Sequence, residues 1–150
     1  MNTERTILLV EDNPSDVELT RRALARKQIS NSMVVANDGE EALAMLTAHE
    51  SHRRIHPAVI LLDLNLPKVS GLEVLRRLRA DAKTRLIPVV VLTTSNEERD
   101  ITSSYALGAN SYIRKSIDFV AFADTIAQLG RYWLTINEPP PAQAANGVVN

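Results

Sequence analysis

The chain has 150 residues, of which 45% are hydrophobic and 23% charged, a composition typical of one globular domain with a hydrophobic core. Its 17 Lys and Arg nearly balance its 18 Asp and Glu, and a net charge of −1 gives no general attraction to nucleic acid or to an anionic membrane. The absence of cysteine excludes disulfides, and since no apolar run approaches ~20 residues and no signal-peptide core begins the chain, we expect a cytoplasmic protein.

The first predicted strand is the apolar run at residues 7–10. Two acids follow it directly, Glu11 and Asp12. Asn13 and Pro14 then predict the start of a helix, because Asn is a favourable N-cap and Pro suits the first helical position. We expect this helix to end near residue 27.

A short second strand is expected at residues 33–36, and Asp38 with Glu41 predicts a capped helix that ends before residue 51. The segment 49–56 contains three histidines, whose spacing offers a weak pattern for a metal site. We prefer a solvated loop, because no neighbouring carboxylate beyond Glu50 completes a ligand set.

The third strand carries the most informative stretch of the chain. Val59 to Leu62 is an apolar run without alternation, as expected for a strand buried on both faces of a parallel sheet. Asp63 follows it, and Pro67 with Gly71 makes continuation of the strand unfavourable. Asp63 is therefore expected at the carboxyl end of a central strand, where open α/β sheets bind their ligands. A capped helix should follow and end near residue 81.

The remaining pattern continues strand and helix in alternation. We expect a buried strand at 88–94, a helix from 95 to about 107 with few apolar positions, an edge strand at 111–115 and a last helix at 118–137. The Pro-, Ala- and Asn-rich residues 138–150 are expected to be a disordered tail.

Five strands alternating with five helices predict a doubly wound α/β domain over residues 1–137, with a parallel sheet covered by helices on both faces. The carboxyl ends of four strands would then bring together Glu11, Asp12, Asp63, Thr93 and Lys115. Adjacent carboxylates repel each other, so a hard divalent cation, Mg²⁺, is expected among the acids. Asp63 could then attack a phosphoryl group that Thr93 and Lys115 hold, and form an aspartyl phosphate.

These residues resemble bacterial response-regulator receiver domains, in the five-stranded 2-1-3-4-5 order, across about residues 5–130. The resemblance rests on the following motifs: Val10-Glu11-Asp12-Asn13, Leu62-Asp63-Leu64-Asn65-Leu66-Pro67 with Gly71, Leu92-Thr93-Thr94, Gly108-Ala109 and Tyr112-Ile113-Arg114-Lys115.

The resemblance implies a role for each site residue. Asp63 would accept a phosphoryl group from a histidine kinase, Asp12 and the backbone carbonyl of Asn65 would bind Mg²⁺, and Glu11 would assist through water. The family's signalling phosphoacceptors are not enzymes that act on a separate substrate.

Thr93 and Lys115 would contact the phosphoryl group, and Tyr112 would be the rotamer switch. Ser116 departs from the family pattern, in which a proline follows the lysine through a cis bond. A cis bond before a residue other than proline costs ~3 to 4 kcal/mol, so either this strain is retained or the loop is built differently.

A narrower resemblance is to single-domain regulators paired with phytochrome-type histidine kinases. It rests on Pro88-Val89-Val90-Val91-Leu92-Thr93-Thr94-Ser95, Lys115-Ser116 and Tyr132-Trp133-Leu134. We expect no output domain beside the receiver domain, so the signal would leave through a protein contact, a dimer or a phosphorelay.

Two other classes of function compete with this interpretation. A dehalogenase-like phosphohydrolase also uses a strand-end aspartate, but it needs a general acid two residues on, where this chain has Asn65. A receiver-like binding module that is never phosphorylated is the other alternative.

The last helix predicts a homodimer. A heptad-spaced apolar seam comprises Phe119, Phe122, Ile126, Leu129, Trp133 and Ile136. The alternative is that this stripe packs on the domain's own sheet. A helix of roughly 20 residues extends ~30 Å against a sheet ~20 Å tall, so we expect Trp133, Leu134 and Ile136 to project beyond the core.

Overall fold

The computed structural model describes residues 5–26, 33–48 and 54–141. They form a five-stranded parallel sheet with the strand order β2-β1-β3-β4-β5, as predicted. The strands are β1 (Ile7–Val10), β2 (Met33–Ala36), β3 (Val59–Leu62), β4 (Val89–Thr93) and β5 (Ser111–Arg114).

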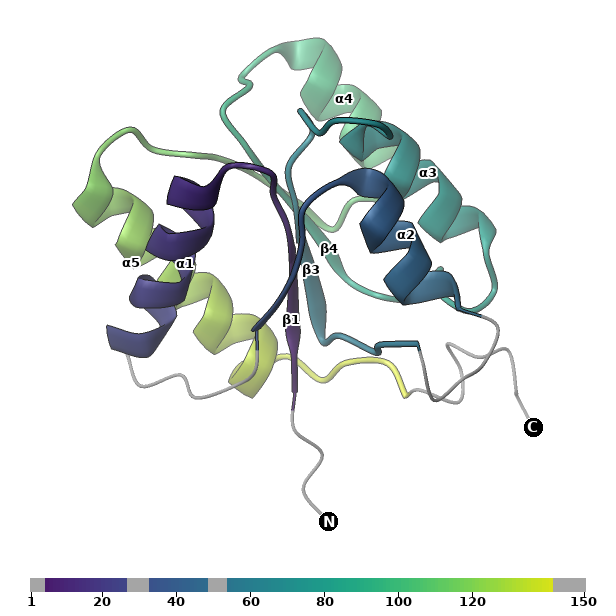
Figure 1. Cartoon of the computed structure of the whole chain (residues 1–150), viewed down its shortest axis with the longest axis horizontal. Coiled ribbons are helices and arrows are strands. Elements are labelled where there is room, and N and C mark those ends of the chain that lie inside the picture. Colours follow the sequence, from purple (N-terminus) through teal and green to yellow (C-terminus); the bar gives the residue numbers. More distant parts are fainter. Residues whose placement is uncertain (1–4, 27–32, 49–53, 142–150) are drawn as a thin grey trace.

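Helices cover both faces of this sheet. Figure 1 shows α1 and α5 on one face, and α2, α3 and α4 on the other. The helices are α1 (Pro14–Arg26), α2 (Gly39–Thr47), α3 (Gly71–Ala80), α4 (Glu98–Ala106) and α5 (Phe119–Arg131), and α5 continues into the π-helical turn η2 (Tyr132–Ile136). In the described part of the chain, the helices are all too short or too polar to cross a membrane.

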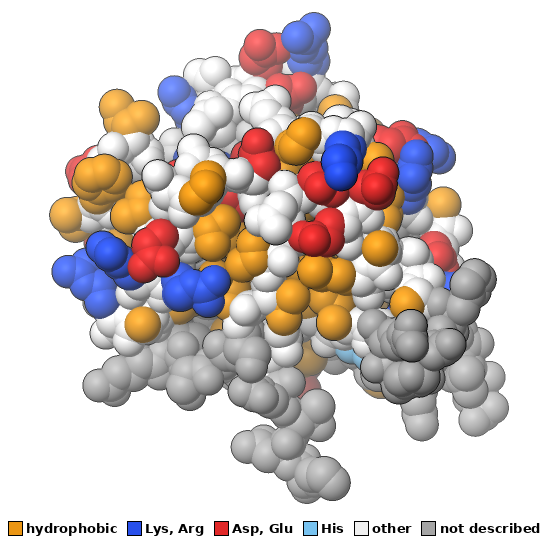
Figure 2. Space-filling view, in the orientation of Figure 1, with side chains coloured by type: hydrophobic (Ala, Val, Ile, Leu, Met, Phe, Trp, Pro, Cys, Tyr) orange, Lys and Arg blue, Asp and Glu red, His pale blue; other side chains and the backbone are white. Residues whose placement is uncertain are grey.

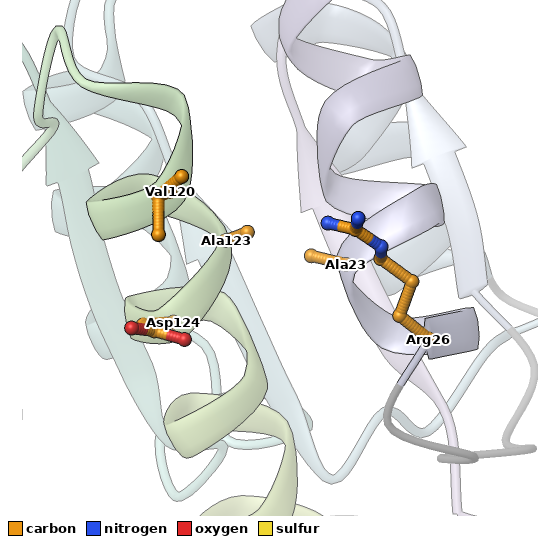
Figure 3. A pocket seen from close by; sticks show the side chains of 5 residues that line it. All are labelled: Ala23, Arg26, Val120, Ala123 and Asp124. Atoms are coloured by element: carbon orange, nitrogen blue, oxygen red, sulfur yellow. The ribbon is translucent and has the colours of Figure 1, made fainter.

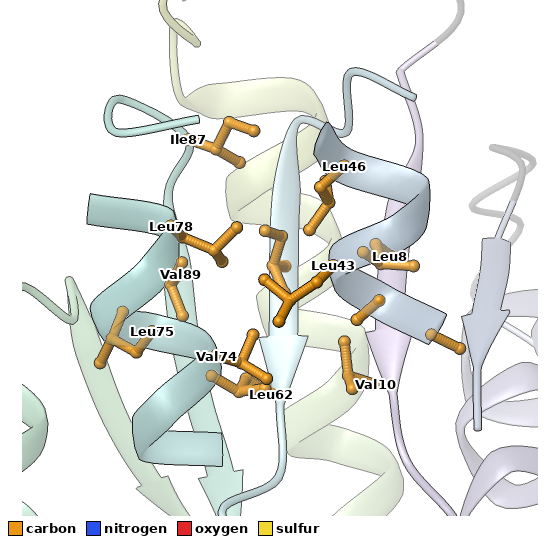
Figure 4. Packing of buried hydrophobic residues seen from close by; sticks show 13 residues of the cluster. Leu8, Val10, Leu43, Leu46, Leu62, Val74, Leu75, Leu78, Ile87 and Val89 are labelled. Atoms are coloured by element: carbon orange, nitrogen blue, oxygen red, sulfur yellow. The ribbon is translucent and has the colours of Figure 1, made fainter. Parts of the chain in front are cut away.

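The central strands are buried on both faces because their side chains alternate between two cores. On β1, Leu8 and Val10 join the core beneath α2 and α3, while Ile7 and Leu9 join the core beneath α1 and α5. Figure 4 shows the first core, in which Leu43 of α2 and Leu78 of α3 point toward the sheet. This packing explains why the apolar runs without alternation correctly predicted β1, β3 and β4.

The start of α4 differs from the prediction. The Ser95-to-Glu98 pattern indicated a capped helix from residue 95, but α4 begins at Glu98, and no side chain caps it. The Ser95 hydroxyl instead donates to Asp100 Oδ2 at 2.6 Å, so it does not cap the helix. Within α4 only Ser104 is buried, which agrees with the few apolar positions found in the sequence.

Two predictions concern residues outside the described part of the chain. Residues 142–150 of the predicted tail lie outside the described residues, as do His49 and His52 of the histidine-containing segment. The peptide bond between Lys115 and Ser116, on which the sequence left two alternatives, is trans.

Candidate functional site

The candidate site lies at the carboxyl edge of the sheet. Val10 and Leu62 are paired across β1 and β3, so the residues that follow them, Glu11 and Asp63, emerge side by side. The Asp63 amide donates to the Val10 carbonyl at 3.2 Å and continues this pairing one residue beyond the strands. The sheet register therefore brings these two acids together, although they are far apart in sequence.

Asp63 is held in a tight turn. Its side chain is almost fully buried, and its Oδ1 accepts a hydrogen bond from the Asn65 amide at 3.2 Å. The Gly71 amide donates to the Leu64 carbonyl at 3.0 Å and closes the turn before α3. Asn65 itself is exposed and lies within this turn.

Three acids form a compact cluster. Glu11, Asp12 and Asp63 each place a carboxylate oxygen within 4.8 Å of the others. Glu11 and Asp63 are buried and Asp12 is exposed, so the cluster is open to solvent on one side. Burial, together with the negative charge of Asp63, raises the pKa of Glu11 to about 7 even though its bond to Lys115 works to lower it. Oxygen ligands crowded in this way fit a hard divalent cation.

Lys115 reaches the same cluster from the end of β5. Its Nζ lies 2.5 Å from Glu11 Oε1, 2.9 Å from Asp16 Oδ2 and 3.2 Å from Asp63 Oδ2. Burial of the ammonium works to lower the pKa of Lys115, but the hydrogen bonds to Glu11 and Asp16 and the charge of Asp63 raise it above its ordinary value. The structure thus places a charged ammonium against the predicted phosphoacceptor.

Thr93 lies on β4, the strand next to β3, and Tyr112 lies on the edge strand β5 beyond it. Thr93 is fully buried, and within the described residues its hydroxyl has no hydrogen-bond partner. Its carbonyl accepts a 2.7 Å hydrogen bond from the Lys115 amide, which ties the ends of β4 and β5 together. Tyr112 is half-buried and donates its hydroxyl proton to the Ser95 carbonyl at 2.9 Å. The loop before α4 is therefore tethered to β5 by one side chain.

Sequence reasoning missed Asp16 as a member of the site. Its place in the first turn of α1 is usual for an acid that stabilises the amino end of a helix, yet its carboxylate reaches Lys115, 99 residues away. Helical spacing gives no signal for this contact, because Asp12 precedes α1 and Lys115 follows β5.

The residues of the predicted dimer seam have different environments. Phe122 and Ile126 are buried in the core beneath α1 and α5, and the structure corrects the seam at these two positions, because they face the chain's own sheet. Leu129 and Trp133 are half-buried and pack against the same core. Phe119 and Ile136 are exposed, at 70% and 58%.

The expected projection of Leu134 beyond the core is wrong. Leu134 is 3% exposed and belongs to the core that also contains Ile7 and Ala58 from the amino end of the sheet. Arg5 donates to the carbonyls of Leu134 and Asn137 at 2.9 and 3.0 Å and fastens η2 to the chain before β1. The core therefore extends further along the last helix than the length of the strands indicated.

A shallow groove separates α1 from α5. Figure 3 shows Ala23 of α1 and Ala123 of α5 pointing toward each other across it, with Val120 and Asp124 along its α5 side. The groove exists because both helices present alanines where larger side chains would fill the gap. Figure 2 shows hydrophobic side chains on the surface at its left edge, over the first turns of α5, where Phe119 and Val120 are each 70% exposed.

The sequence of this chain is similar to those of known proteins. Residues 7–127 match the response regulator receiver domain. The chain belongs to this family. Among its relatives, the probable methanogenesis regulatory protein FilR2 of Methanothrix harundinacea is 41% identical over 89% of this chain and 86% of its own length. Response regulator Rcp1 of Synechocystis is 37% identical over 94% of this chain and 97% of its own length.

Solved structures give the same result. The phosphorylated cyanobacterial phytochrome response regulator RcpA superposes with a TM-score of 0.86 at 39% identity, covering 93% of this chain and all of that chain. The Mn²⁺-bound form of Rcp1 has a TM-score of 0.84 at 36% identity, covering 91% and 99%. The bacteriophytochrome response regulator RtBRR has a TM-score of 0.71 at 47% identity, covering 97% and 90%. The chain is thus a receiver domain similar to phytochrome-associated response regulators, and its acidic cluster fits a divalent metal ion.

Proposed function

We propose that this receiver domain accepts a phosphoryl group on Asp63 from a phytochrome-type histidine kinase, with Mg²⁺ as the ion in the acidic cluster. The observation that carries the proposal is the contact of a buried carboxylate, Asp63, with the ammonium of Lys115 at 3.2 Å beside Glu11 and Asp12. The similarity to the phytochrome response regulators supports the choice of kinase.

In the transfer step, an oxygen of Asp63 forms a bond to phosphorus as the bond between phosphorus and the kinase histidine breaks. The histidine nitrogen keeps the electron pair of that bond. A divalent cation bound by Glu11 and Asp12 would offset negative charge on the carboxylates and on the phosphoryl oxygens. Lys115 donates to a phosphoryl oxygen from the other side. Thr93, whose hydroxyl has no partner in the described part of the chain, supplies a further donor.

The response would pass through α4. Once Thr93 donates to a phosphoryl oxygen, its movement changes the space behind it, and the hydroxyl of Tyr112 can leave the Ser95 carbonyl. Because α4 buries a single residue and lacks a side-chain cap, it is the helix that can shift at the lowest cost. Its rearrangement would present a new surface to a downstream protein in the cytoplasm.

The chain would not be an enzyme that acts on a separate substrate. The phosphohydrolase alternative requires an acid two residues after Asp63. That position holds Asn65, whose side chain is not an acid and whose backbone amide donates to the Asp63 carboxylate. The only chemistry proposed is gain and loss of the phosphoryl group on Asp63.

Intact-mass spectrometry of the protein incubated with acetyl phosphate and Mg²⁺ tests the proposal. Wild type should gain the mass of one phosphoryl group, and Asp63→Asn should gain none. The matched control Asp81→Asn changes an acid at the end of α3 and should label as wild type does. A phosphoryl group on another residue, or equal labelling of Asp63→Asn, would contradict the assignment, and steady hydrolysis of phosphate esters would favour the phosphohydrolase.

A further inference from the structure

One ammonium group, that of Lys115, donates to three carboxylates in this site. A lysine ammonium has three N–H donors, and the three oxygens around Lys115 Nζ come from Glu11, Asp16 and Asp63. All three contacts are shielded, since the Lys115 side chain is only 7% exposed. The donors of Lys115 are therefore fully used in this arrangement.

The three carboxylates differ in whether they belong to the acidic cluster. Glu11 and Asp63 belong to the cluster that can hold a divalent cation, whereas Asp16 does not. A cation and the ammonium thus compete for the same two side chains, because both need the oxygens of Glu11 and Asp63. Asp16 is the partner of Lys115 that a cation does not need.

Asp16 is placed where it can fix the position of the Lys115 ammonium. It lies in the first turn of α1, which is fixed because Asn13 Oδ1 accepts from the Ser15 amide at 2.9 Å. From there its carboxylate meets the ammonium at 2.9 Å, closer than Asp63 does at 3.2 Å. Attraction to Asp16 therefore pulls Lys115 toward α1 without removing it from the phosphoacceptor.

We propose that Asp16 is a positioning residue that holds Lys115 to one side, so that Glu11 and Asp63 can turn to a divalent cation while the ammonium stays beside Asp63. The inference rests on the proposed function of the site, since it assigns a regulator of cation binding there. Without Asp16, the ammonium satisfies its donors on Glu11 and Asp63 alone and competes directly with the cation.

A double-mutant cycle separates this role from a simple loss of charge. Mg²⁺ affinity is measured by titration calorimetry, without a phosphoryl donor, in wild type, Asp16→Asn, Lys115→Met and the double variant. Salt at about 0.15 M does not screen Asp16 from the cluster, because both Asp16 and Asp63 contact the same ammonium, so the Lys115→Met background measures the direct effect of the Asp16 charge on the cation. Asp16→Asn should weaken binding about tenfold, as is typical when a partner that orients a ligand is lost. In the Lys115→Met background the same change should cost about threefold or less.

Glu18→Gln is the matched control. It removes one negative charge from the same helix, at an exposed residue paired with Arg22 at 3.0 Å, and should leave Mg²⁺ affinity as in wild type. Denaturant unfolding of each variant checks that α1 remains folded.

Unchanged Mg²⁺ affinity in Asp16→Asn would overturn the inference, as would an equal loss in the wild-type and Lys115→Met backgrounds. Failure of the proposed function looks different. In that case Asp63 takes up no phosphoryl group, yet the coupling between Asp16 and Lys115 is still measured in the calorimeter.

Discussion

Gly71 packs directly against the backbone of Asp63, 8 residues earlier in the chain. A Cβ placed on Gly71 would overlap the carbonyl oxygen of Asp63 and crowd the Cα of Leu64. Both of these neighbours are backbone atoms, so they cannot turn aside as a flexible side chain could. The glycine is required because the first turn of α3 closes over the turn that carries the phosphoacceptor.

Gly71→Ala should therefore lower the free energy of unfolding by about 1 to 3 kcal/mol, the usual cost of an additional methyl group in a packed site. It should also slow phosphorylation, because the carboxylate of Asp63 moves with its backbone. Chemical denaturation and the rate of labelling by acetyl phosphate measure the two effects. Ser70→Ala removes the hydroxyl that caps α3 and serves as the control, since it should reduce stability without displacing Asp63. A Gly71→Ala protein as stable and as reactive as wild type would contradict the steric argument.

Divalent-cation binding should depend on pH through Glu11. Burial raises the pKa of Glu11 to about 7, above its ordinary value of 4.5. A cation requires the deprotonated carboxylate, so affinity for Mg²⁺ should rise about tenfold between pH 6 and pH 8. The stability of the metal-free protein has the opposite pH dependence. Because the pKa of Glu11 is higher in the folded state, the contribution of Glu11 to stability is greatest below pH 4.5 and is lost as the pH rises through about 7.

Calorimetry in buffers of different ionisation enthalpy would count the protons released when Mg²⁺ binds. Glu11→Gln provides the control, because it keeps the shape of the side chain and removes the group that titrates. Its weaker affinity should no longer vary between pH 6 and pH 8. Equal pH dependence in wild type and Glu11→Gln would assign the titration to another group.

The pattern of the sequence predicted the sheet and the central acids because both depend on local order along the chain. Residues 59–62 form an apolar run that ends in an acid and a turn, and such a run can be buried in few ways other than as a central strand. The register that aligns Val10 with Leu62 then brings Glu11 to Asp63 without further information.

The features that escaped prediction depend on contacts between distant segments. Asp16 follows the usual pattern of an acid near a helix start, and only the fold shows that Lys115 reaches it. Ser95 matches a capping pattern, but its hydroxyl bonds the side chain of Asp100 instead. Leu134 lies next to the predicted seam rather than in it, and its burial depends on how far the core extends at the amino end of the sheet.

Thr93 should affect stability and signalling in opposite directions. Its buried hydroxyl has no partner among the described residues, and such a group typically costs ~1 to 3 kcal/mol. Thr93→Val replaces the hydroxyl with a methyl group of similar size, so the resting protein should become more stable by about 1 kcal/mol. The same variant should still be phosphorylated on Asp63 but should transmit less change to α4.

Amide hydrogen exchange in α4, measured with and without acetyl phosphate, tests the second part. Wild type should show a change in exchange over α4 on phosphorylation, and Thr93→Val should show much less. Thr93→Ser, which retains the hydroxyl, is the control and should respond as wild type does. A change in α4 exchange as large in Thr93→Val as in wild type would show that this hydroxyl is not needed for signalling.

A homodimer through the last helix should depend on its exposed ends rather than on the whole predicted seam. The inner residues Phe122 and Ile126 already pack within one chain, so the apolar surface left for a partner is at Phe119, Val120 and Ile136. Burying an exposed side chain of this kind contributes about 1.5 to 3 kcal/mol, and a symmetric pair of chains buries each one twice. Tyr132, 45% exposed, stacks edge-on against Trp133 at 4.9 Å and adds an aromatic surface near the same end as Ile136.

Phe119→Glu combined with Ile136→Glu should therefore convert the dimer to a folded monomer, because each charge would have to be buried in the interface. Both positions are exposed in one chain, so the substitutions leave its core intact, whereas Trp133→Glu would also disturb the core beneath α1 and α5. Light scattering at tens of micromolar protein gives the mass, with and without phosphorylation, and labelling of Asp63 confirms that the fold is retained. Leu86→Glu changes an exposed apolar residue in the segment between α3 and β4 and should leave the dimer unaffected. A wild-type protein that is monomeric in both states would exclude the dimer, and a dimer that survives the double substitution would place the interface on another surface.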